Sequence, residues 1–108
     1  MRILFDQGVP RGLKASLRVH EVTEARKLGW ERISNGDLLS LAEGANFELL
    51  LTTDKNLRYQ QNFSGRKVSI VVLGNSPWWL VRKHLDAIIA AVDSATPGSY
   101  AEVAIPFK

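Results

Sequence analysis

The chain has 108 residues, of which 45% are hydrophobic and 23% charged, so its size and composition fit one globular domain and exclude wholesale disorder or a fibrous repeat. It contains no cysteine, which excludes disulfides, a thiolate nucleophile and a zinc site built on cysteine, and which fits a reducing compartment. The net charge of +3 mildly favours a polyanionic partner.

The first part of the chain alternates strand and helix signals. Arg2–Phe5 is a short apolar run that predicts a strand, and it meets Asp6 too early to be the apolar core of a signal peptide. Pro10 suits a first helical turn, and Leu13 and Leu17 follow it four residues apart, so we expect a helix there. Residues 20–23 predict a second strand. We expect a cytoplasmic protein without a membrane partner.

The remaining elements continue this alternation. Ser34 and Asp37 form a pattern like a capping box, which predicts the start of a helix of two or three turns. Residues 48–53 and 68–73 are apolar runs typical of buried strands. Residues 76–93 carry apolar side chains at helical spacing and predict the clearest helix; its apolar positions are Val81, Leu85, Ile88 and Val92. Residues 100–105 predict a late edge strand.

Alternating strands and helices with short connections predict a single α/β domain with a mainly parallel sheet flanked by helices. In such sheets the functional site lies beyond the carboxyl ends of the strands. Asp6 and Asp54 each follow a predicted strand directly. We therefore expect both aspartates at that edge.

Three aspartates are the candidate catalytic and metal-binding residues: Asp6, Asp37 and Asp54. Clustered carboxylates suit Mg²⁺ or Mn²⁺, which can activate water for hydrolysis of a phosphodiester. Each aspartate also has a structural interpretation. Asp6 could form an Asx-turn, Asp37 could be the acid of a capping box, and Asp54 could cap the turn that follows it.

Basic residues lie close in sequence to Asp54, and they are candidates for contacts with nucleic-acid phosphates: Lys55, Arg58, Arg66 and Lys67. The alternative is a solvated loop in which acids and bases pair weakly. The adjacent Trp78 and Trp79 are more typical of a core or of a dimer interface than of a base-stacking surface.

Three segments resemble the small bacterial PIN-like proteins of the PIN superfamily: residues 3–10 (ILFDQGVP), 35–39 (NGDLL) and 52–57 (TTDKNL). The resemblance extends over residues 1–73. It implies a parallel sheet flanked by helices and the activity of a metal-dependent ribonuclease, as in VapC-like toxins. It also implies a carboxylate site made by Asp6, Asp37 and Asp54, with Asn35 and Asn56 close enough to assist.

Such nucleases usually add a glutamate from an early helix, and here residues 21–28 offer Glu24 without a clear motif around it. Two functions therefore stay open. The first is a Mg²⁺- or Mn²⁺-dependent endoribonuclease acting on RNA, as the toxin of a toxin–antitoxin pair with an antitoxin protein as partner. The second is a catalytically inactive PIN-like module that binds RNA or a protein; a homodimer is compatible with both.

Overall fold

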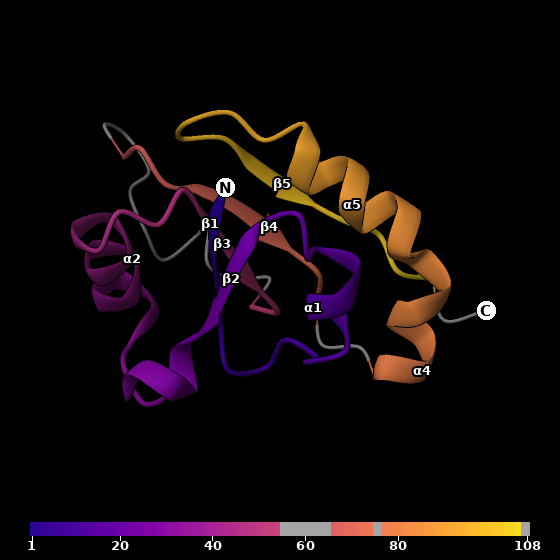
Figure 1. Cartoon of the computed structure of the whole chain (residues 1–108), viewed down its shortest axis with the longest axis horizontal. Coiled ribbons are helices and arrows are strands. Elements are labelled where there is room, and N and C mark those ends of the chain that lie inside the picture. Colours follow the sequence, from indigo (N-terminus) through magenta and orange to yellow (C-terminus); the bar gives the residue numbers. More distant parts are fainter. Residues whose placement is uncertain (55–65, 75–76, 107–108) are drawn as a thin grey trace.

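Five short parallel strands form the centre of the molecule, in the order β2-β1-β3-β4-β5 (Figure 1). The strands are β1 Arg2–Phe5, β2 Glu21–Glu24, β3 Leu49–Thr52, β4 Ser69–Val72 and β5 Tyr100–Glu102. This computed structural model describes residues 1–54, 66–74 and 77–106, with only the backbone of Asn35. Every neighbouring pair of strands is parallel. The predicted α/β class with a parallel sheet is confirmed.

Helices cover both faces of the sheet (Figure 1). The α-helices are α1 Leu13–Ser16, α2 Asn35–Gly44, α4 Trp78–Val81 and α5 Leu85–Asp93, and the short 3-10 helices are η1 Ala25–Leu28 and η2 Arg82–His84. On one face Leu13 of α1 and Ile88 of α5 pack against Ile3 and Phe5. On the opposite face α2 packs against β1, β3 and β4 through the buried residues Leu38, Leu39 and Ala42. The sheet is thus the middle of three layers.

The strands are short because each apolar run is bounded by polar residues and turns. All four residues of β3 and of β4 are buried, as expected for strands covered on both faces. Both edge strands are more exposed: β2 begins with the exposed Glu21, and β5 ends with the exposed Glu102. The predicted edge position of the last strand is therefore correct.

The predicted helix over residues 76–93 is divided in the structure. The backbone of His84 has φ −125° and ψ 28°, outside helical values, so η2 separates α4 from α5. Val81, Ile88 and Val92 face the core as predicted, whereas Leu85 is half-buried beside it. The helical spacing continues through this break and therefore does not reveal it.

The predicted capping box at the start of α2 does not form. Ser34 is the N-cap residue with extended backbone, but its side chain makes no capping hydrogen bond, and Asp37 is exposed in the first turn.

Within the described ranges, no helix is long and apolar enough to cross a membrane.

Candidate functional site

The strand order places a functional edge between β1 and β3. From β1 the chain proceeds to β2 on one side, and β3 then pairs with the other side of β1. Parallel sheets bind ligands beyond the carboxyl ends of the strands, at the point where the strand order reverses in this way. Asp6 follows β1, and Asp54 lies two residues after the end of β3. Both aspartates therefore lie at the carboxyl edge of the two strands that flank this point.

Hydrogen bonds fix the Asp6 carboxylate in this position. Its Oδ2 accepts a hydrogen bond of 2.7 Å from the hydroxyl of Thr52, and its Oδ1 accepts one of 2.7 Å from the backbone N–H of Gln7. The Thr52 oxygen in turn accepts the backbone N–H of Asp54 at 3.2 Å. One fully buried hydroxyl therefore joins the ends of the two central strands.

The loops beyond these strands also approach each other closely. A Cβ atom added to Gly8 would lie 2.5 Å from the Oγ1 of Thr53, so the loop after β1 lies against the side chain of Thr53, which follows β3. Asp6 itself is half-buried. The edge is thus a hydrogen-bonded corner with a partly accessible acid.

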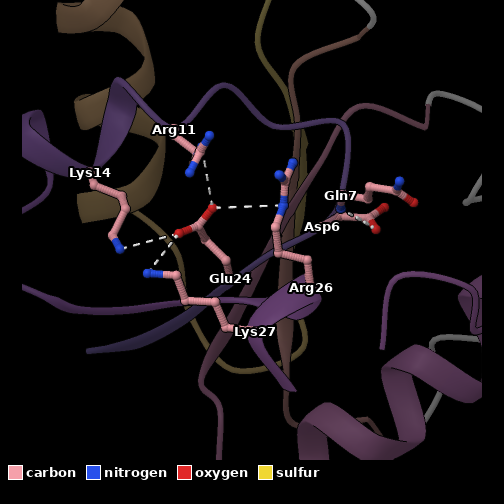
Figure 2. A network of polar contacts seen from close by, with 7 residues as sticks. All are labelled: Asp6, Gln7, Arg11, Lys14, Glu24, Arg26 and Lys27. Carbon is pink, nitrogen blue, oxygen red and sulfur yellow. Dashed lines mark hydrogen bonds and ion pairs between the residues drawn. The ribbon is translucent and has the colours of Figure 1, made fainter. Parts of the chain in front are cut away.

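A second polar group lies at the end of β2, where Glu24 is 5% exposed. Four cationic side chains surround it (Figure 2). Its Oε2 is 3.3 Å from Lys14 Nζ and 3.6 Å from Lys27 Nζ. Its Oε1 is 3.9 Å from Arg11 Nε and 4.0 Å from Arg26 Nε. We call these four cations with Glu24 the Glu24 cluster; it contains an excess of three positive charges.

The charges of this cluster determine the ionisation of Glu24. Burial alone would raise the pKa of Glu24, but the hydrogen bond from Lys14 and the charges of Lys14, Lys27 and Arg11 outweigh it and lower the pKa from its ordinary value. Glu24 is therefore ionised at neutral pH. All four cations are far more exposed than the carboxylate, and Arg11 and Lys27 keep most of their contact with water.

Glu24 and Asp6 belong to different faces of the sheet. Val22 packs with the residues under α1, and the two-residue repeat of a strand places Glu24 on this same face, where Lys14 meets it. Leu4 and Leu50 pack under α2 on the opposite face. Asp6 and Thr52 lie two residues after them, so they belong to that same α2 face. Glu24 and Asp6 therefore lie in rows on different faces of the sheet, and the carboxylate of Glu24 contacts cations.

The three predicted aspartates do not form one ligand group. Among the residues that the structure describes, no three or more His, Cys, Asp or Glu side chains are placed to hold a metal ion together. The hydroxyl of Thr52 links the side chain of Asp6 to the backbone of Asp54. Asp37 is exposed at the start of α2. The other end of α2 leads through Glu48 to the amino edge of the sheet, so the start of α2 and Asp37 lie towards the carboxyl edge. Asp37 is nevertheless outside the hydrogen-bonded group of Asp6, Thr52 and Asp54.

The predicted nucleic-acid contacts are only partly within the described residues. Arg66 and Lys67 precede β4 and lie at the amino edge of the sheet, opposite Asp6. Arg66 Nη1 is 2.7 Å from Oε1 of Glu43, and the backbone N–H of Lys67 donates to Oε2 of the same carboxylate at 2.9 Å. Proximity in sequence to Asp54 therefore does not bring these two cations to the site.

The contacts with Glu43 also affect its ionisation. The hydrogen bond from the Lys67 backbone lowers the pKa of Glu43. The hydrogen bond and the charge of Arg66 lower it further, whereas burial acts in the opposite direction.

Three predicted residues, Lys55, Asn56 and Arg58, lie outside the described residues, and of Asn35 only the backbone is described.

Sequence reasoning missed two features of this edge. Thr52 was part of a predicted strand, and only the pairing of β1 with β3 shows that its hydroxyl meets Asp6. The Glu24 cluster joins Arg11 and Lys14 to Arg26 and Lys27, which lie two and three residues after Glu24 in the chain. A glutamate at the end of a strand, followed by Arg26 and Lys27, was a usable signal for it.

The sequence matches no protein-family model, and neither the search of curated proteins nor the search of solved structures finds a similar protein.

Proposed function

We propose that this protein is a metal-dependent ribonuclease of PIN-like type that cleaves RNA at the carboxyl edge of β1 and β3. The observation that carries the proposal is the Asp6 carboxylate, held by Thr52 and Gln7 at the point where the strand order reverses. The resemblance of residues 3–10, 35–39 and 52–57 to PIN-like proteins supports the same activity.

The donor set at this edge fits Mg²⁺ or Mn²⁺. Magnesium sites commonly use only one or two protein carboxylates, with waters and substrate phosphates as the other ligands. Asp6 and Asp54 would supply these carboxylates, and each Asp6 oxygen keeps a second lone pair beside the hydrogen bond that it accepts. When bound, the metal ion would activate water and stabilise the negative charge of the phosphodiester.

The residues of the chain have separate tasks in this proposal. Thr52 and Gln7 orient Asp6, so the carboxylate does not need to reorganise when substrate binds. Gly8 lets the loop after β1 lie close to Thr53, which keeps the two strand ends together. Asp37 would join the site only through a ligand that extends to the start of α2.

The decisive experiment compares Asp6→Asn with wild-type protein on varied single-stranded RNAs, with Mg²⁺ or Mn²⁺ and with EDTA. We expect metal-dependent cleavage by the wild type and a loss of at least about 100-fold in Asp6→Asn, the scale of removing a group that acts in the transition state. Asp86→Asn is the matched control, because it makes the same change of charge on an exposed side chain of α5 and should leave cleavage unchanged. Cleavage that is independent of metal, or unchanged in Asp6→Asn, would reject the proposal.

The second candidate is a catalytically inactive PIN-like module that binds RNA or a protein. It is favoured by the position of Glu24, which is surrounded by four cations on the α1 face and does not join Asp6. Under this alternative the wild-type protein binds RNA without cleaving it, and Asp6→Asn binds it equally well. An antitoxin partner would be tested by co-purification with the product of a neighbouring gene.

A further inference from the structure

We infer that a single strand of nucleic acid binds across α1 and the start of α4, with its phosphates on the Glu24 cluster and a base stacked on Trp78. This inference deepens the proposed function, since it names the surface that would hold an RNA substrate. It is argued from the placement of two exposed tryptophans beside a cluster of cations.

The first observation is the exposure of aromatic surface on α4. Trp78 and Trp79 are 39% and 46% exposed, whereas the following Leu80 and Val81 are buried and anchor the helix. Adjacent exposed tryptophans give this end of α4 an apolar aromatic surface, and contiguous exposed apolar surface is typical of interaction sites. Lys83 Nζ lies 5.6 Å from the centre of the Trp79 ring, which adds a positive charge to the same surface.

The second observation is that Trp78 lies beside the cations. A Cβ atom added to Gly12 would be 2.6 Å from the Cζ2 atom of Trp78, so the indole rests directly on the backbone of Gly12. Arg11 precedes Gly12 in the chain and reaches towards Glu24. Figure 1 shows the same neighbourhood, with α4 next to α1. One residue therefore separates the stacking surface from the first cation of the Glu24 cluster.

The third observation is that the cluster is organised but not neutralised. Glu24 holds four cations within 4.0 Å, and a single carboxylate cannot balance their charge. Arg11 and Lys27 remain about two-thirds exposed and can reach an external anion without leaving their positions. The buried carboxylate therefore arranges the cations and leaves an excess of positive charge for a ligand.

A single-stranded nucleic acid has the chemistry that this surface recognises. Proteins bind such strands by combining a cationic track for the phosphates with aromatic rings on which bases stack. A duplex offers the phosphates but keeps its bases stacked internally. The indole of Trp78 rests on Gly12, directly beside Arg11 in the chain, so a base and a neighbouring phosphate of one strand could be held together.

The test measures binding of a fluorescein-labelled 12-nucleotide oligouridylate in EDTA, where metal-dependent cleavage cannot occur. Trp78→Leu should weaken binding roughly 5- to 150-fold, which corresponds to the loss of one stacked base. Trp78→Phe keeps an aromatic ring and should retain most of the affinity. Gly12→Ala removes neither charge nor ring, but it should also weaken binding, because the new methyl group displaces the indole.

The cations are tested by the dependence of binding on salt. Arg11→Gln and Lys27→Gln should each reduce the slope of log K against log salt by about 0.7, the value for one phosphate contact on a single strand. Arg18→Gln is the matched control, since Arg18 is exposed beyond the other end of α1. Circular dichroism and thermal unfolding establish that each variant is folded.

The outcomes separate this inference from the proposed function. Normal binding by Trp78→Leu and Arg11→Gln would overturn the inference, even if Asp6 proves essential for cleavage. Weakened binding by both variants would support it, even if the wild type cleaves no RNA. A change in association state in Trp78→Leu, without a change in RNA affinity, would overturn it in favour of a second copy of the chain as the occupant.

Discussion

Replacement of Thr52 by valine tests whether one hydroxyl connects the ends of β1 and β3. The substitution keeps the shape of the side chain but removes the donor to Asp6 Oδ2 and the acceptor for the Asp54 N–H. A hydrogen bond to a charged group contributes about 1.5 to 3 kcal/mol, and a buried N–H left without a partner costs about 1 to 3 kcal/mol. The added methyl group offsets about 0.8 kcal/mol. Because Asp6 and Asp54 are only half-buried and regain water, we expect a net loss of about 1 to 3 kcal/mol.

Urea denaturation measures this loss directly, and each kcal/mol should lower Tm by about 4 to 8 °C in a domain of this size. Thr23→Val is the matched control, because Thr23 is a half-buried threonine on β2, outside the contact with Asp6. A double-mutant cycle with Asp6→Asn should give a coupling of at least about 0.5 kcal/mol. A loss below about 0.5 kcal/mol in Thr52→Val, equal to that of the control, would refute the argument.

Three further predictions concern the fold. Ile88→Ala truncates a fully buried side chain of α5 and should cost about 2 to 5 kcal/mol in urea denaturation; a cost below 0.5 kcal/mol would mean that α5 does not pack on the sheet. Folding lowers the pKa values of Glu24 and Glu43, so the stability that these groups contribute is complete above about pH 4.5 and is lost as the pH falls through their folded pKa values. Glu43→Gln should therefore reduce the loss of unfolding free energy at acid pH. An unchanged acid dependence would contradict this prediction. Gly98→Ala should destabilise the protein more than Gly29→Ala. Both glycines have φ 77°, but only the new methyl group at Gly98 would lie 2.7 Å from the carbonyl oxygen of Arg66. Equal unfolding midpoints of the two variants would reject that contact.

The fold could be predicted because the strands are continuous apolar runs and the connections are short. β1 was placed at its observed bounds, and the other strands within one to three residues at each end, since hydrophobic burial on both faces leaves a strong pattern. The division between α4 and α5 could not be predicted, because it depends on the backbone angles of His84 and not on the spacing of apolar residues. The 3-10 helix after β2 was missed for a related reason: its four residues are too few for a periodic pattern.

The candidate site was predicted in part. The position of Asp6 follows from the rule that parallel strands present their carboxyl ends at one edge, and the structure agrees. The rule does not fix the face of the sheet on which each side chain lies. Glu24 and Asp6 follow adjacent strands but belong to different faces of the sheet. Arg66 is near Asp54 in sequence, but in the structure it pairs with Glu43 at the opposite edge of the sheet. These relations depend on long-range pairing, which a single sequence does not contain.

The position of β1 between β2 and β3 has a consequence for how the chain reaches its native state. Leu4 pairs with Thr23 on one side and with Leu50 on the other, so β1 is completed only after the polypeptide has closed a loop of some 46 residues. Parallel sheets with such distant pairing fold slowly, and their apolar strands stay exposed meanwhile. Partly folded molecules would therefore present Ile3, Leu4 and Phe5 to chaperones, and slower synthesis at low temperature should raise the yield of native protein.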